Sequence, residues 1–273
     1  MAWLVDDEIM DRVERLEIDF NRYGVDAYGA SKRDMARAGT VMAWLYRKYF
    51  DVSVHGIEHV PKRGRGMLVG NHSGGLALDA MIVSASMMLE ADPPRLVNAM
   101  ADKFIERVPF GSMILSRLGQ LTGLPQHAVR LLNDDRLLMV FPEGHHGTAK
   151  LYGDRNTLVR FGTGFVRLAL RTKTPIVPFA FIGGGEAIPT IANLEKTGKL
   201  LGLPYLPITP YGPPLPRPVA LEIYYSEPMV FEGTGNEEDR VIQEYVDKVR
   251  DRIAELIERG VRIRKGRGEA SQS

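Results

Sequence analysis

The chain has 273 residues, of which 44% are hydrophobic and 25% charged, and its formal net charge at pH 7 is +1. This length and hydrophobic content suit one large α/β domain, and the small net charge gives no global attraction to nucleic acid. Because the chain contains no cysteine, disulfide bonds, thiolate nucleophiles and cysteine-ligated metal sites are excluded.

The first fifty residues predict two helices. Apolar residues recur at three- and four-residue spacing over residues 3–23, and a second amphipathic pattern covers residues 32–50. The second pattern combines Met, Trp and Tyr with basic residues, which fits a helix at a membrane interface as well as a helix packed on a sheet. No stretch reaches the ~18 consecutive apolar residues of a membrane span, and the N-terminus lacks the pattern of a signal peptide.

Residues 51–232 alternate between strand and helix patterns. Short apolar runs predict strands near residues 52–60, 67–69, 95–99, 120–123, 137–141, 176–182 and 221–225. Helical patterns lie between them at residues 76–88, 109–118, 128–133 and 163–172. This order predicts a single α/β domain with a mostly parallel or mixed central sheet covered by helices, preceded by the two N-terminal helices of residues 1–50.

Two later segments have distinct compositions. Residues 198–218 contain repeated prolines, which oppose helix and central strand, yet the segment is apolar and aromatic. It fits a buried irregular loop, the wall of a substrate pocket or a lip that contacts a membrane. Residues 233–273 predict a C-terminal helix of the same domain over 237–258, followed by a solvated basic tail.

His72 lies where a central strand would end, which is the usual edge for a site in an open α/β sheet. A histidine beside glycines can be a capping or packing residue, but a carboxylate within reach would make it an oriented general base. Asp79 lies seven positions further on, ~10.5 Å along the axis of a continuous helix. We therefore expect Gly74 and Gly75 to turn the chain back, with the helix starting after them.

A second polar strand end follows the apolar run of residues 137–140. Its residues are Phe141, Pro142, Glu143, Gly144, His145 and His146. Polar ends of neighbouring parallel strands meet at one edge of a sheet, so we expect this turn to lie beside His72.

Together these stretches resemble the glycerolipid acyltransferase family of lysophospholipid acyltransferase-like proteins. The similar stretches are, in chain order, Asn71-His72 with Asp79, residues 101–111, Phe141-Pro142-Glu143-Gly144 and Val177-Pro178. They resemble the family's His/Asp motif, the segment between its motifs, its acceptor-binding motif and its late Val-Pro motif. The order of the motifs is more specific than any one of them.

The resemblance implies that residues 51–232 transfer a fatty acyl group from an acyl thioester directly to a hydroxyl of a glycerolipid or other lipid alcohol. His72 would be the general base and Asp79 its orienting carboxylate. Acyl-CoA or acyl-carrier protein would be the co-substrate, with no bound cofactor or metal and no nucleic acid partner. A chain without a membrane span would reach its lipid acceptor by peripheral association with the cytoplasmic, inner face of a membrane.

Two departures from the family pattern bear on activity. Six residues rather than four separate His72 from Asp79, and His145-His146 follow the acceptor motif where phosphate-acceptor members have Thr or Ser and then Arg. Because a phosphate favours an arginine fork, we expect a neutral glycerolipid or long-chain alcohol as acceptor. Cations that could instead serve a phosphate are Lys103, Arg107, Lys150 and Arg155.

Three other functions stay open. The first is a 1-acylglycerol-3-phosphate acyltransferase of phospholipid synthesis, and the second is a non-catalytic lipid-binding protein. The third, a lipid hydrolase, would need a nucleophile, and the stretch Gly70–Gly74 misses the Gly-x-Ser-x-Gly elbow by one position. The adjacent pair His145-His146 lacks an evident third metal ligand, so we expect no metal site.

Overall fold

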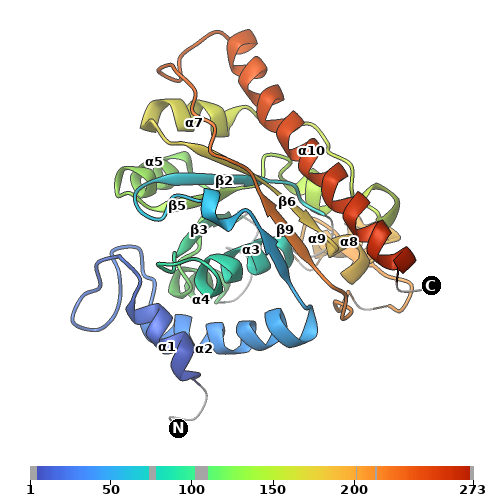
Figure 1. Cartoon of the computed structure of the whole chain (residues 1–273), viewed down its shortest axis with the longest axis horizontal. Coiled ribbons are helices and arrows are strands. Elements are labelled where there is room, and N and C mark those ends of the chain that lie inside the picture. Colours follow the sequence, from blue (N-terminus) through green and yellow to red (C-terminus); the bar gives the residue numbers. More distant parts are fainter. Residues whose placement is uncertain (1–4, 74–77, 102–109, 201, 213, 271–273) are drawn as a thin grey trace.

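A seven-stranded sheet forms the centre of the computed structural model, which describes residues 5–73, 78–101, 110–200, 202–212 and 214–270 (Figure 1). Across the sheet the strands are β1 (Ser53–His55), β9 (Glu222–Tyr225), β6 (Ile176–Ile182), β2 (Gly66–Gly70), β5 (Leu137–Val140), β3 (Val97–Ala101) and β4 (Leu121–Thr122). The pairing of β6 with β9 is antiparallel and the other pairings are parallel. The predicted α/β fold with a mostly parallel, mixed sheet is confirmed.

The central strand β2 explains how the sheet is covered on both faces. All five of its residues are buried between β5 and β6, as expected of a parallel strand with a continuous apolar run. Because side chains alternate along a strand, Leu68 joins the apolar cluster on one face, whereas Met67 and Val69 join the cluster on the other.

Helices lie on both faces of this sheet (Figure 1). The Leu68 face is covered by α3 (Leu78–Leu89) and by the C-terminal part of α2 (Lys32–Trp44), which continues into a π-helical turn, Leu45–Tyr49. The opposite face is covered by α5 (Pro125–Asn133), α7 (Gly164–Thr172) and α10 (Asp239–Ala270). A shorter helix, α4 (Gly111–Arg117), lies between β3 and β4 in the chain.

The first predicted helix is too long. In the structure α1 spans Asp7–Glu14, with the Asp6 side chain accepting a hydrogen bond from the backbone N–H of Glu8 at its start. Leu16 is still buried in the same apolar cluster as Val13, but it reaches that cluster from irregular chain. Helical spacing beyond Glu14 therefore reflected shared burial rather than a continuing helix.

The C-terminal helix is longer than predicted. The expected frayed tail is wrong up to Ala270, because α10 continues as helix to that residue. Arg264 Nη1 donates to the carbonyl oxygen of Ala220 at 2.7 Å, so at least one basic side chain of this tail docks on the domain.

The proline-rich segment is more regular than predicted. After α8 (Gly184–Ala187), strand β7 (Ala192–Leu194) leads through α9 (Glu195–Leu200) to β8 (Leu206–Ile208), which pairs antiparallel with β7. A strand of a two-stranded sheet has one unpaired edge, which tolerates a proline such as Pro207. Of the helices in the described part of the chain, none has the length and apolar character needed to cross a membrane.

Candidate active site

Asn71 marks the point at which the chain leaves β2. Its side-chain Oδ1 accepts from the backbone N–H of Phe181 at 2.8 Å, and its Nδ2 donates to the carbonyl oxygen of Phe181 at 3.1 Å. The amide therefore continues the pairing of β2 with β6 through a side chain. The main chain is then free to turn away from the sheet just before His72.

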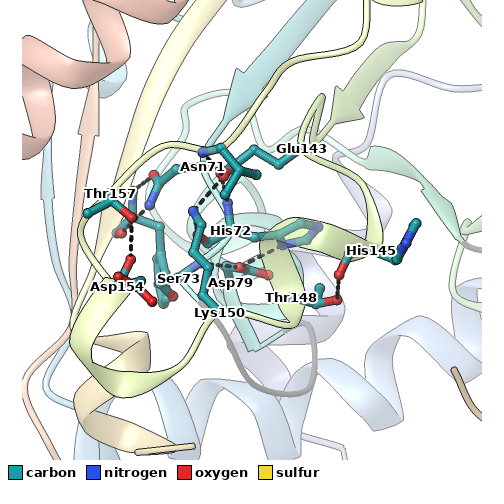
Figure 2. Close-up of polar contacts among 12 residues, drawn as sticks. Asn71, His72, Ser73, Asp79, Glu143, His145, Thr148, Lys150, Asp154 and Thr157 are labelled. Atoms are coloured by element: carbon teal, nitrogen blue, oxygen red, sulfur yellow. Dashed lines mark hydrogen bonds and ion pairs between the residues drawn. The ribbon is translucent and has the colours of Figure 1, made fainter. Parts of the chain in front are cut away.

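His72 and Asp79 are in direct contact (Figure 2). The distance from His72 Nδ1 to Asp79 Oδ2 is 2.8 Å, and Asp79 Oδ2 also accepts from the backbone N–H of Ser73 at 3.3 Å. The predicted contact is confirmed despite the longer spacing between the two residues. The turn expected at Gly74 and Gly75 lies outside the described residues.

This contact favours the tautomer of the neutral imidazole in which Nδ1 carries the proton. An ionised carboxylate only accepts hydrogen bonds, so Nδ1 carries the proton that it donates to Asp79. In the neutral ring the lone pair is then on Nε2, where a general base needs it. The side chain of His72 is 8% exposed and that of Asp79 is 1% exposed, so solvent screens their interaction weakly.

Two neighbours hold the His72 ring and backbone in place. The phenyl ring of Phe141 stacks on the imidazole, with the ring centroids 3.9 Å apart and the planes inclined by 12°. Gly147 lies so close that an added Cβ would be 2.8 Å from the Cβ atoms of His72 and Glu143. The second motif therefore lies directly against the first, as the sequence predicted.

Glu143 is buried and both of its carboxylate oxygens have partners within the protein (Figure 2). Oε1 accepts from the backbone N–H of His72 at 3.0 Å. Oε2 accepts from the backbone N–H of Val159 at 2.9 Å and lies 2.6 Å from Lys150 Nζ. Lys150 Nζ also donates to the carbonyl oxygen of His72 at 2.6 Å. Burial lowers the pKa of Lys150, and the charge of Glu143 opposes that shift.

The turn after Glu143 carries the two adjacent histidines. Gly144 adopts a φ of 56°, a conformation that favours glycine, and α6 (His145–Thr148) follows it. The rings of His145 and His146 lie 3.9 Å apart on the surface. His145 points away from the His72–Asp79 pair (Figure 2), so acceptor binding by these histidines stays a prediction.

The cations proposed for a phosphate have other surroundings or lie outside the described residues. Arg155 Nε pairs with Glu186 Oε1 at 2.8 Å, and Arg155 Nη1 donates to the carbonyl oxygen of Tyr152 at 2.7 Å. Its guanidinium also lies 4.0 Å from the centroid of the Tyr152 ring. Lys103 and Arg107 lie outside the described residues. Substrate binding by these three residues stays a prediction.

Tyr205 is a neighbour of the site that sequence reasoning missed. It comes from the proline-rich segment, is 9% exposed, and hydrogen-bonds the side chain of Thr148. Burial raises the pKa of its phenol, and the nearby charge of Asp79 raises it further against the effect of Thr148. A pocket wall was one of three interpretations that the composition of residues 198–218 left open, and nothing in the sequence singled out this tyrosine.

Several known proteins are similar to this chain in sequence. Residues 51–182 match the family described as Acyltransferase. The uncharacterized protein Rv0502 of Mycobacterium tuberculosis is 33% identical over 248 residues, which cover 87% of this chain and 69% of that protein. A human protein named "DGAT1/2-independent enzyme synthesizing storage lipids" is 24% identical over 246 residues, covering 87% of this chain and 71% of that protein.

A solved structure supports the same fold. The crystal structure of the 1-acyl-sn-glycerophosphate (LPA) acyltransferase PlsC from Thermotoga maritima has a TM-score of 0.53 and 18% sequence identity. The similarity covers 82% of this chain and 78% of that one. The family match over residues 51–182 and the 33% identity to Rv0502 show that the chain belongs to the acyltransferase family, and the shared fold agrees with this assignment.

Proposed function

We propose that the protein transfers a fatty acyl group from an acyl thioester to the hydroxyl of a neutral glycerolipid or a long-chain alcohol. The observation that carries the proposal is the 2.8 Å contact of His72 Nδ1 with Asp79 Oδ2, beside the acceptor motif of the family. A base oriented by a buried carboxylate can accept a proton from an alcohol, which is the chemistry that acyl transfer to a hydroxyl needs.

The reaction has two proton steps. His72 Nε2 accepts the hydroxyl proton of the acceptor as its oxygen attacks the thioester carbonyl, and Asp79 stabilises the imidazolium that forms. The new C–O bond forms, the C–S bond breaks, and the imidazolium returns the proton to the departing sulfur. The products are an ester and a free thiol, and no acyl-enzyme is formed.

A neutral acceptor suits the charges around the site. Lys150 and Arg155 are already paired with Glu143 and Glu186, and two surface histidines occupy the positions after the acceptor motif. Uncharged histidines can hydrogen-bond a hydroxyl or an ester without leaving a cation unpaired. The human relative's name, which describes synthesis of storage lipids, gives further support.

We also propose that the acceptor enters from a membrane surface. Tyr49 donates a hydrogen bond from its hydroxyl to the carbonyl oxygen of Pro216 at 2.8 Å, so the end of the second helix and the proline-rich segment lie side by side. Beside this contact Trp44 is 58% exposed and Leu215 is 69% exposed. Neighbouring exposed apolar side chains of this kind favour peripheral binding to a lipid bilayer.

The test is a side-by-side assay of the purified protein with oleoyl-CoA or oleoyl-acyl-carrier protein as donor. The acceptors are monoacylglycerol, diacylglycerol, hexadecanol and lysophosphatidate. We expect ester formation with a neutral acceptor, a loss on the order of 10²-fold or more in His72→Ala, and a smaller loss in Asp79→Asn. Full activity of His72→Ala would disprove the assigned base.

The same assay separates the other functions. Thioester consumption without any alcohol would indicate a hydrolase, and lipid binding without thioester consumption would indicate a binding protein. A clear preference for lysophosphatidate that Arg155→Ala abolishes would show that the acceptor carries a phosphate.

A further inference from the structure

We propose that Lys150 is a positioning residue for His72, which it holds through a buried ion pair with Glu143. The inference rests on the proposed function, because it concerns the placement of the proposed base. It assigns Glu143 to the same internal pair instead of to contact with the acceptor.

Both members of the ion pair hydrogen-bond the backbone of the same residue, His72. The peptide N–H of His72 donates to Glu143 Oε1 at 3.0 Å, and the peptide carbonyl of His72 accepts from Lys150 Nζ at 2.6 Å. The two charged groups contact each other at 2.6 Å. One ion pair therefore holds both main-chain polar groups of His72, after the chain has left the hydrogen-bonding of the sheet.

The segment between the two charges completes the enclosure. Residues 143–150 run from the end of β5 through α6 and bring Gly147 against the Cβ atoms of both His72 and Glu143. The backbone of His72 is thus contacted by the first and last residues of this segment and its Cβ by the middle. Figure 2 shows the Lys150 side chain reaching across to the backbone beside His72.

The Lys150–Glu143 ion pair is buried, so the cost of removing its charges from water offsets much of its attraction. The side chains of Lys150 and Glu143 are 2% and 0% exposed. Apolar residues of similar size often stabilise a protein as well as a buried ion pair does, so stability alone does not account for it. A pair of full charges does give short, directional hydrogen bonds, which suit the precise placement of a backbone.

The same contacts argue against a role in acceptor binding. Glu143 already accepts from three donors, namely His72 N–H, Val159 N–H and Lys150 Nζ. Loss of the Lys150 ammonium would leave the Glu143 carboxylate and the His72 carbonyl buried without this partner. The His72 ring would then move relative to the bound substrates, and a displacement near 1 Å can cost about 10²-fold in rate.

The experiment compares Lys150→Met, Lys150→Arg and, as a matched control on the exposed surface of α10, Lys248→Met. Each variant is assayed for kcat and for the KM of oleoyl-CoA and of the acceptor that the wild-type protein uses best. We expect Lys150→Met to lower kcat by about 10- to 100-fold with both KM values within about twofold, Lys150→Arg to restore most of kcat, and Lys248→Met to match wild type.

A second comparison covers the case in which Lys150→Met does not fold. The double variant Lys150→Met with Glu143→Gln removes both charges and leaves no unpaired buried ion. We expect this variant to fold and to have a kcat as low as that of Glu143→Gln alone, because the two residues act as one unit. Thermal unfolding of every variant identifies losses that come from unfolding alone.

Two results would overturn the inference. A rise in acceptor KM at unchanged kcat would make Lys150 and Glu143 acceptor-binding residues, and unchanged kcat and KM in folded Lys150→Met would make the pair dispensable. Neither result affects the proposed function, which fails only if the wild-type protein forms no ester or if His72→Ala stays active.

Discussion

The imidazole of His72 and the phenyl ring of Phe141 are nearly parallel, with their centroids 3.9 Å apart. Phe141 in turn meets Phe179 edge to face, with centroids 5.8 Å apart and planes at 84°. Asp79 fixes the imidazole by a hydrogen bond at Nδ1, and this aromatic stack limits rotation of the ring. Phe141, the first residue of the acceptor motif, therefore packs directly against His72 of the His/Asp motif.

Removing that ring should lower the rate without preventing folding. We predict that Phe141→Leu reduces kcat by about 10-fold, because the imidazole gains rotational freedom and loses its aligned position. Phe141→Tyr keeps the aromatic face and should retain more activity. Steady-state kinetics of both variants test this, and equal kcat values for Leu and wild type would exclude a role of the stack.

Gly147 should tolerate no side chain. An added Cβ would be 2.8 Å from the Cβ atoms of His72 and Glu143, and neither backbone-proximal carbon can move freely. We predict that Gly147→Ala lowers the free energy of unfolding by about 1–3 kcal/mol, typical of overpacking, and also lowers kcat.

The control for this substitution is Gly153→Ala. A Cβ at Gly153 meets no atom within 4 Å, so this change should leave both stability and kcat near wild type. Chemical denaturation and the ester assay measure the two effects. A Gly147→Ala variant as stable and active as Gly153→Ala would contradict the close contact.

Some contacts around His72 could be predicted from the sequence, and others could not. The contact of His72 with Asp79 was predictable, because the two residues resemble the His/Asp motif of the family and a general base is oriented by a carboxylate within reach. The partners of Lys150 and Tyr205 were not predictable. Both side chains reach the site from segments whose paths depend on tertiary packing, and no periodic pattern records such a contact.

Some elements of the fold were likewise predictable from the sequence, and others were not. Strands such as β2 and β6 were evident because complete burial requires continuous apolar runs. The end of α1 was not evident, because Leu16 is buried although it lies beyond the helix. The pairing of β7 with β8 around Pro207 was not evident either. Helix ends and edge strands depend on local hydrogen bonds that composition does not specify.

Membrane binding should depend on the exposed side chains of Trp44 and Leu215. We predict that Trp44→Glu combined with Leu215→Glu abolishes most flotation with anionic liposomes, because each charge must be desolvated at the bilayer. Val230→Glu changes an apolar residue that follows β9 and is 75% exposed, more than either Trp44 or Leu215, and this variant should float like wild type. Unchanged flotation of the double variant would disprove this site of contact.

Acid should weaken the attachment of α1 to the π-helical turn Leu45–Tyr49 that follows α2. Hydrogen bonds from Arg47 at 2.6 and 2.8 Å lower the pKa of Glu8 from 4.5 to about 2. Since the folded-state pKa lies below the unfolded value, the stabilisation is present above pH 4.5 and is lost as the pH falls towards 2.

We therefore predict that Glu8→Gln is less stable than wild type at pH 7 by under about 1 kcal/mol, as befits a solvent-screened pair. The difference should shrink steadily as the pH falls through this window. Urea denaturation of both proteins at about pH 7, 5, 4 and 3 measures this difference. These pH values lie on both sides of 4.5, the ordinary pKa of the Glu8 carboxylate. A difference independent of pH would mean that packing, and not charge, accounts for the effect.

The region that matches the family ends at Ile182, the last residue of β6, whereas Tyr205 belongs to the chain that follows. The base and its positioning contacts are thus encoded before Ile182, and one wall of their surroundings is encoded after it. Substitutions around Tyr205 would therefore alter the surroundings of His72 without changing the residues that hydrogen-bond to it or stack on it.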